Sequence, residues 1–135
     1  MALDYGTKRV GIAVSDPQQI IATALTTIHS SELFDFLQQY MQQEPVETIV
    51  VGFPLQVNGQ VSESAQHVVG IIRRLKKTFP AVVIKRIDER YTSKMASAAI
   101  AQSGLNKKAR QDKGRIDRMS AVILLQDYMQ RIQNL

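Results

Sequence analysis

The chain of 135 residues contains no cysteine. Disulfide bonds, zinc–thiolate sites and cysteine nucleophiles are therefore excluded, and the composition is compatible with a reducing compartment. Any bound metal ion would have to be held by oxygen ligands or by one of the two histidines, His29 and His67. Both histidines fall on ordinary segments outside the motifs described below, so we expect neither of them to bind metal or to transfer protons.

Long hydrophobic runs are also missing. The apolar stretches are short and are interrupted by charged residues, and the amino-terminal residues lack the basic region and the cleavage site of a secretion signal. These absences predict a soluble cytoplasmic protein that is not associated with a membrane. The sequence has no repeat and no low-complexity tract, and its length suits one folded unit. We therefore expect a single domain over residues 1–135.

The charge that is present is unevenly distributed. The formal net charge is +5, and residues 104–118 carry six basic and two acidic side chains. A basic surface concentrates polyanions and makes their binding dependent on salt, as is typical of nucleic-acid-binding proteins. A solvated lysine-rich loop is the other explanation of such a segment.

Apolar residues alternate in the amino-terminal segment. Val10, Ile12 and Val14 would lie on one face of a strand, and the polar residues 4–9 before them are typical of a turn, so a β-hairpin is predicted. Residues 20–28 are rich in β-branched side chains and predict a third antiparallel strand.

Helical and extended patterns alternate in the rest of the chain. Residues 48–53 are apolar without alternation, as expected of a strand covered by helices on both faces, and residues 82–87 predict a second strand of this kind. Helices are expected at residues 33–41, from about Ser62 to Pro80, at about 92–102, and after residue 115, the last with Ile116, Met119, Ile123 and Leu124 facing inward. The order predicts an α/β fold with a central mixed five-stranded sheet flanked by helices.

Three carboxylates fall at the ends of these expected elements, namely Asp4, Glu89 and Asp117. Because ligands bind beyond the carboxyl ends of the strands in such sheets, the three acids are candidates for one site. Phosphodiester hydrolysis commonly uses hard divalent cations held by carboxylate oxygens. Taken singly, each acid has a structural explanation: Asp4 as a turn former, Asp117 as a helix-start acid, and Glu89 as part of a solvated strand end.

Four motifs occur in order along the chain and together closely resemble the YqgF family. They are LDYGTKRVGIAVSD at residues 3–16, VVGFPLQVNG at 50–59, DERYTS at 88–93 and KGRIDRMSAVILLQ at 113–126. That family is described as Holliday-junction resolvases and as nucleases that process the 5′ end of pre-16S ribosomal RNA. The resemblance covers essentially the whole chain and implies a ribonuclease H-like fold.

The resemblance also implies site residues. The metal-binding and catalytic acids of the family correspond to Asp4, Glu89 and Asp117, with Mg²⁺ or Mn²⁺ as the cofactor, and they imply a metal-dependent nuclease. Whether Asp88 joins them remains open, because the family pattern places two acids side by side. Relatives usually carry a few more residues before LDYG, so we expect the strand that supports Asp4 to be shortened.

Basic residues near these motifs are the candidates for nucleic-acid binding. Lys8 and Arg9 would contact the backbone, and Arg90 would either bind phosphate or orient Asp88. A basic arm that becomes ordered on nucleic acid is expected from Lys107, Lys108, Arg110, Lys113 and Arg115.

Two other classes of protein compete with the nuclease. An ATPase of the actin and sugar-kinase type shares Asp-x-Gly-Thr, but this chain has one lobe and no Gly-Gly pair. A non-catalytic RNA-binding module fits the basic arm equally well. The substrate also stays open between precursor rRNA, with ribosomal particles as a further candidate partner, and branched DNA, as does the choice between a monomer and a homodimer.

Overall fold

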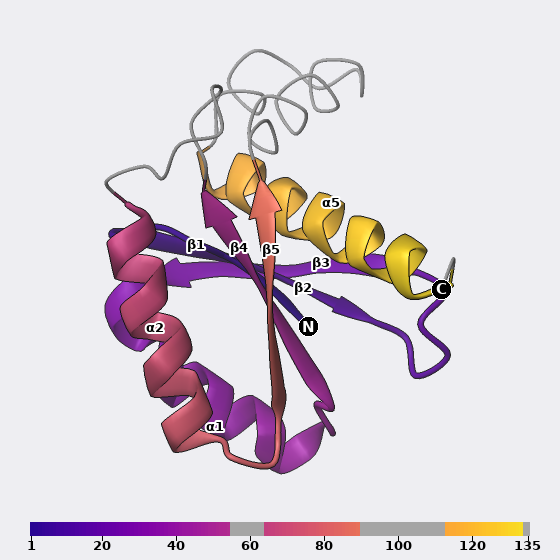
Figure 1. Cartoon of the computed structure of the whole chain (residues 1–135), viewed down its shortest axis with the longest axis horizontal. Coiled ribbons are helices and arrows are strands. Elements are labelled where there is room, and N and C mark those ends of the chain that lie inside the picture. Colours follow the sequence, from indigo (N-terminus) through magenta and orange to yellow (C-terminus); the bar gives the residue numbers. More distant parts are fainter. Residues whose placement is uncertain (55–63, 90–112, 134–135) are drawn as a thin grey trace.

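The computed structural model describes residues 1–54, 64–89 and 113–133 (Figure 1). Five strands form one sheet in the order β3-β2-β1-β4-β5, with β1, β4 and β5 parallel and β2 antiparallel to both of its neighbours. The strands are β1 (Ala2–Tyr5), β2 (Arg9–Ser15), β3 (Ala22–His29), β4 (Thr48–Pro54) and β5 (Val83–Glu89). The helical elements are the 3-10 turn η1 (Ser30–Glu32), α1 (Leu33–Gln43), α2 (Ala65–Thr78) and α5 (Lys113–Gln133). The predicted mixed five-stranded α/β fold is confirmed.

Helices cover both faces of this sheet: α1 and α2 lie on one face and α5 lies on the other (Figure 1). On one face Leu3 and Ile12 are fully buried in a core that also includes side chains of α1 and α2. On the other face Ala2 and Ala13 are buried beneath α5. Alternation along β1 and β2 thus assigns successive residues to the two layers, as the period of an extended chain requires. The expected helix at 92–102 and the expected helix start near Ser62 lie outside the described residues.

Strand β1 lies in the middle of the sheet. The amine of Met1 donates a hydrogen bond to the carbonyl of Thr48 at 3.1 Å, and the amide of Val50 donates to the carbonyl of Met1 at 2.8 Å. On its other side β1 is paired with β2 through four residue pairs. β1 comprises only four residues, but strands on both sides pair with it and hold Asp4 in place.

The prediction that residues 82–87 form a strand covered on both faces was wrong. β5 is an edge strand, in which Ile87 is buried whereas Lys85 and Arg86 are exposed. A strand is present here as predicted, but its apolar residues did not indicate that it lies at the edge of the sheet, because composition alone does not determine the order of strands.

The last helix differs from its prediction in start and in orientation. α5 begins at Lys113, so Lys113 and Arg115 belong to its first turn and not to a loop. Ile116, Met119 and Ile123 are only partly buried. Leu124 is buried as predicted, and Met119 packs against the same core; the other buried side chains are Ser120, Ala121, Val122, Leu125 and Met129. The helix is apolar on several sides, and its small residues allow the closest approach to the sheet. No described helix is both long enough and apolar enough to cross a membrane.

Candidate active site

Two of the three predicted acids meet at the carboxyl end of β1. Asp4, the third residue of β1, and Asp117, in the second turn of α5, line one open pocket of about 300 Å³. The other lining residues are Gly6, Thr7, Lys8 and Arg9, which form the turn between β1 and β2 and the start of β2. Residues separated by more than a hundred positions in the chain thus share one pocket.

Gly11 allows α5 to bring Asp117 to this position. Gly11 is the pairing partner of Asp4 across β1 and β2. A Cβ atom at position 11 would overlap the carbonyl group of Asp117 and would lie 2.9 Å from the amide nitrogen of Arg118. Since even one methyl group would collide with helix backbone here, the helix can lie on the strand only where the strand carries glycine.

Two further contacts attach the start of α5 to β3. The hydroxyl of Thr27 donates a hydrogen bond to the carbonyl of Gly114 at 2.6 Å, and the guanidinium of Arg118 donates to the Thr27 hydroxyl at 3.4 Å. The sequence analysis assigned no role to Gly11, Thr27 or Arg118. The small residues Gly11 and Ala13 on one face of β2 were a usable signal for close helix packing, whereas nothing in the sequence marked Thr27.

Arg9 forms an ion pair with Asp117. Its Nε donates a hydrogen bond to Oδ2 of Asp117 at 2.7 Å, and 42% of the Arg9 side chain is exposed against 19% for Asp117. A pair this accessible to solvent adds little to stability, but it fixes the direction of the carboxylate. The structure therefore gives Arg9, predicted as a phosphate contact, a positioning role beside Asp117.

The turn before Arg9 is held from two sides. The amide of Gly6 donates to the carbonyl of Arg9 at 2.8 Å. The Ser30 hydroxyl donates to the carbonyl of Thr7 at 2.6 Å, and the Ser30 amide donates to the carbonyl of Lys8 at 3.1 Å. Lys8 is exposed on this turn and lines the pocket, and the backbone that carries it is held by these hydrogen bonds.

The two histidines lie on other parts of the structure. The ring of His29 accepts a hydrogen bond from the amide of Ser31 at 3.1 Å and so caps η1. His67 is exposed on α2. The hydrogen bond of His29 is that of a structural cap.

The structure separates Asp88 from the pocket. Asp88 contacts the guanidinium of Arg86 at 3.5 Å, and that guanidinium lies 4.2 Å above the centre of the Phe53 ring, on the face of the sheet covered by α1 and α2. Asp4 lies on the opposite face, beneath α5. Glu89 is the last residue of β5 and is paired with Pro54. The side chain of Glu89 lies outside the described part of the structure, as do Arg90, Lys107, Lys108 and Arg110.

The donor chemistry of the pocket fits a hard cation. Within residues 1–54, 64–89 and 113–133, no cluster of three or more histidine, cysteine, aspartate or glutamate side chains occurs. Asp4 and Asp117 supply carboxylate oxygens in one pocket, and oxygen ligands are those that Mg²⁺ and Mn²⁺ prefer. The open side of the pocket leaves room for further ligands.

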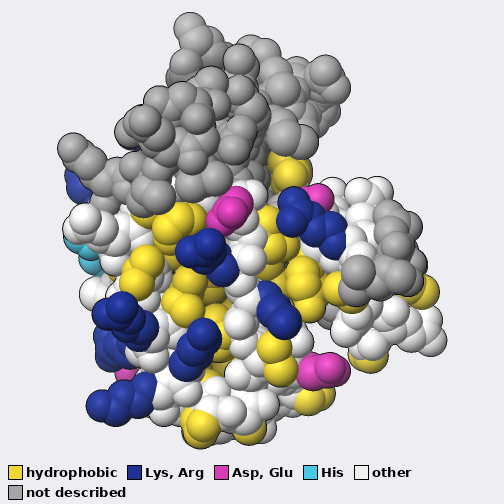
Figure 2. Space-filling model, in the orientation of Figure 1, with side chains coloured by type: hydrophobic (Ala, Val, Ile, Leu, Met, Phe, Trp, Pro, Cys, Tyr) yellow, Lys and Arg dark blue, Asp and Glu magenta, His cyan; other side chains and the backbone are white. Residues whose placement is uncertain are grey.

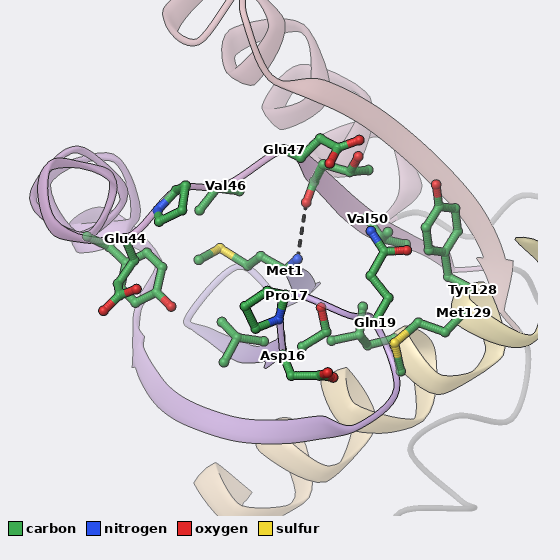
Figure 3. A pocket seen from close by; sticks show the side chains of 16 residues that line it. Met1, Asp16, Pro17, Gln19, Glu44, Val46, Glu47, Val50, Tyr128 and Met129 are labelled. Atoms are coloured by element: carbon green, nitrogen blue, oxygen red, sulfur yellow. Dashed lines mark hydrogen bonds between the residues drawn. The ribbon is translucent and has the colours of Figure 1, made fainter.

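A second pocket of about 300 Å³ lies at the opposite end of β1, around Met1 (Figure 3). Among the described residues, its lining includes Asp16, Glu44 and Glu47 but no lysine or arginine, so it would repel a polyanion. Burial lowers the pKa of the Met1 amine from 8.0 to about 6. Burial and the nearby charge of Glu44 raise the pKa of Tyr40.

A mixed sheet with β1 at its centre, and with acids of β1 and of the closing helix meeting at the carboxyl end, defines the class of ribonuclease H-like α/β proteins. The family model described as "RuvX: Holliday junction resolvase" matches residues 1–131, and the chain belongs to this family. The resemblance inferred from the four motifs is thereby confirmed.

Similar proteins have been named in several bacteria. A protein of Flavobacterium johnsoniae is 51% identical over 129 residues, which cover 96% of this chain and 94% of the relative. A protein of Bacteroides fragilis is 47% identical over 130 residues, with the same coverage of each chain. A protein of Porphyromonas gingivalis is 44% identical over 129 residues, again with 96% and 94% covered. Each of the three carries the name "Putative pre-16S rRNA nuclease".

Proposed function

We propose that the chain is a metal-dependent nuclease of the cytoplasm that hydrolyses phosphodiester bonds and processes the 5′ end of pre-16S rRNA. The observation that carries the proposal is the pocket shared by Asp4 and Asp117. The names of the relatives support the choice of rRNA as substrate. The family description supports a junction in DNA as the second candidate substrate.

In this proposal the residues of the pocket have three different roles: metal binding, positioning and phosphate binding. Asp4, Asp117 and Glu89 would hold Mg²⁺ or Mn²⁺, which would neutralise charge at the phosphodiester and activate a water. Arg9 keeps the Asp117 carboxylate directed into the pocket through the 2.7 Å hydrogen bond. Lys8, exposed on the braced turn, binds a phosphate of the substrate next to the reacting bond.

Placement on rigid elements favours catalysis. Asp4 belongs to a strand paired on both sides, and Asp117 belongs to a helix attached to β2 and β3. Carboxylates fixed in this way do not have to be reordered when the metal and the substrate bind, and such preorganisation lowers the barrier to reaction.

The test is cleavage by the purified wild-type protein and by Asp117→Asn. Both are incubated with a 5′-extended 16S precursor RNA and with a four-way DNA junction, in Mg²⁺, in Mn²⁺ and in chelator. Asp127→Asn is the matched control, because Asp127 lies on the same helix and forms an ion pair with Arg131 at 2.9 Å. We expect RNA cleavage by wild type and by Asp127→Asn with metal, and none by Asp117→Asn.

Other outcomes would redirect the proposal. Metal-dependent cutting of the junction alone would favour the resolvase. Salt-sensitive binding without metal-dependent cleavage of either substrate would favour a non-catalytic binding module. Turnover retained by Asp117→Asn would refute the assignment of the site.

A further inference from the structure

Basic side chains gather on the molecule away from the turn that carries Lys8. We call them the α2–β5 basic surface, and Figure 2 shows dark-blue side chains over this side of the molecule. All of its members are exposed, and they are Arg73, Arg74, Lys76 and Lys77 on α2 and Lys85 and Arg86 on β5. They account for six of the 17 lysine and arginine residues of the chain, and none was a candidate for nucleic-acid binding from sequence.

Acidic side chains hardly compensate this charge. Among the described residues, the one ion pair that involves the surface is Arg86 with Asp88, at 3.5 Å and with about half of each side chain exposed. Such a pair is weak and leaves most of the guanidinium available. The surface therefore keeps a positive potential that would attract a polyanion.

The guanidinium groups of two of these arginines stack on aromatic rings. The guanidinium carbon of Arg74 lies 3.8 Å above the centre of the Phe34 ring, and that of Arg86 lies 4.2 Å above the Phe53 ring. Both rings belong to the core. A planar guanidinium stacked on a ring loses conformational freedom but keeps its edge donors free, which suits phosphate recognition.

The surface can reach the pocket of Asp4 around the edge of the sheet, because β5 is the edge strand: Arg86 lies on the face of α1 and α2, whereas Lys85, by alternation with the buried Ile87, lies on the face of Asp4. Arg86 pairs with Val51, and Val51 pairs with Leu3, the residue before Asp4. Two strand spacings, about 10 Å, therefore separate Arg86 from β1 across the sheet. Along the chain, β5 extends for about 20 Å, from Val83, which follows α2, to Glu89, at the end of the sheet where the parallel strands have their carboxyl ends. A nucleic-acid duplex of about six base pairs has the same length.

We propose that the α2–β5 basic surface binds the phosphate backbone of the nucleic acid next to the bond that is cut. The inference rests on the proposed nuclease function and extends it from the reacting bond to the flanking nucleic acid. Structural roles are the competing explanation: Lys76 and Lys77 complement the carboxyl end of α2, and charged residues on β5 discourage pairing of an edge strand. Those roles predict changes in stability or solubility but none in binding.

The lysines provide the cleaner test. Replacing Arg74 or Arg86 would uncover a core ring, so we choose Lys76→Gln/Lys77→Gln/Lys85→Gln, made in the Asp117→Asn background to prevent cleavage. Binding is measured with a single-stranded RNA and with an RNA hairpin carrying a 5′ extension, at several KCl concentrations. Arg131→Gln in the same background is the control, because Arg131 is an exposed cation near the far end of α5.

We expect the triple variant to bind at least about tenfold more weakly at about 0.15 M KCl. The slope of log K against log salt should fall by about 2, since each lost phosphate contact removes about 0.7 to 0.9. A larger effect on the hairpin would identify duplex as the flanking ligand, and a larger effect on the single strand would identify unpaired RNA. The control should keep the wild-type slope.

A second measurement needs no variant. Chemical acetylation of lysines in the wild-type protein, with Mg²⁺ replaced by chelator, should be slowed by bound RNA at Lys76, Lys77 and Lys85. Equal labelling with and without RNA, or an unchanged salt slope in the triple variant, would overturn the inference while cleavage by wild type left the nuclease intact. Loss of slope in the triple variant, together with no metal-dependent cleavage by the wild-type protein, would instead support the surface and refute the nuclease.

Discussion

The backbone of Asp117 lies directly against Gly11, so closely that a Cβ atom at position 11 would overlap its carbonyl group. Through this contact the first turns of α5 rest on β2, and the Asp117 carboxylate reaches the pocket of Asp4. The spacing between strand and helix is thus set by the absence of a side chain.

Gly11→Ala should displace the start of α5. We expect the free energy of unfolding to fall by about 1 to 3 kcal/mol, as for overpacking of a dense interior, together with a large loss of metal-dependent cleavage. Gly70→Ala is the control, because nothing lies within 4 Å of a Cβ at position 70 and the residue is inside α2. That control should gain about 0.5 to 1 kcal/mol in urea unfolding. An active, fully stable Gly11→Ala variant would show that α5 tolerates a larger gap.

Arg9→Gln should leave stability nearly unchanged and impair catalysis. The pair with Asp117 is partly exposed, so we expect a change of less than about 1 kcal/mol in the free energy of unfolding. Without the guanidinium the carboxylate is free to turn, and kcat should fall more than KM rises. Arg9→Lys keeps the charge but not the geometry of Nε. If Arg9 acted by charge alone, Arg9→Lys would retain wild-type kcat.

Asp16 should contribute to stability only above acidic pH. Its carboxylate accepts hydrogen bonds from the amides of Ile21 and Ile20, both at 2.7 Å, and these lower its pKa. Because the folded pKa lies below the unfolded value, the contribution is present above the unfolded pKa and is lost as pH falls through the folded one. Asp16→Ala should therefore be less stable than wild type at pH 7, with a smaller difference near pH 3.

The comparison with Asp16→Asn tests the cause. Asparagine keeps an acceptor oxygen without the charge, so its stability should lie between the other two proteins at pH 7. A difference between wild type and Asp16→Ala that stays constant down to pH 3 would exclude the carboxylate as its source.

The Met1 amine should make stability depend on pH in a different range. In a protein that begins with Met1 and a free amine, burial lowers the pKa of this group from 8.0 to about 6. Between these values the unfolded chain binds more protons than the folded one, so the free energy of unfolding should rise from pH 6 to pH 8, by at most about 2 kcal/mol.

Acetylation of the amine provides the comparison. The acetylated nitrogen cannot be charged but keeps a hydrogen to donate to the carbonyl of Thr48. Urea unfolding at pH 6, 7 and 8 should then show a flatter profile for the acetylated protein. Equal profiles for the two forms would place the titrating group elsewhere.

Local patterns predicted much of the fold. Alternation at Val10, Ile12 and Val14 predicted β2, and the run at 48–53 predicted β4, because periodicity is a property of neighbouring residues. The motifs likewise predicted three acids for one site, and the structure brings two of them, Asp4 and Asp117, into one pocket. Asp4 and Asp117 share one pocket because β1 lies at the centre of the sheet and α5 packs across it.

The sequence by itself determined the kinds of element, their order and the acids that the chain carries. Only the tertiary structure decided that β5 is an edge, that Asp88 faces away from Asp4, and that arginines of α2 and β5 lie over the rings of Phe34 and Phe53. The physical reason is range: hydrogen bonding and periodicity act between near neighbours, whereas strand order and helix approach depend on packing between distant segments. At Gly11 a local property of the sequence, the absence of a side chain, allows a contact between the distant segments β2 and α5.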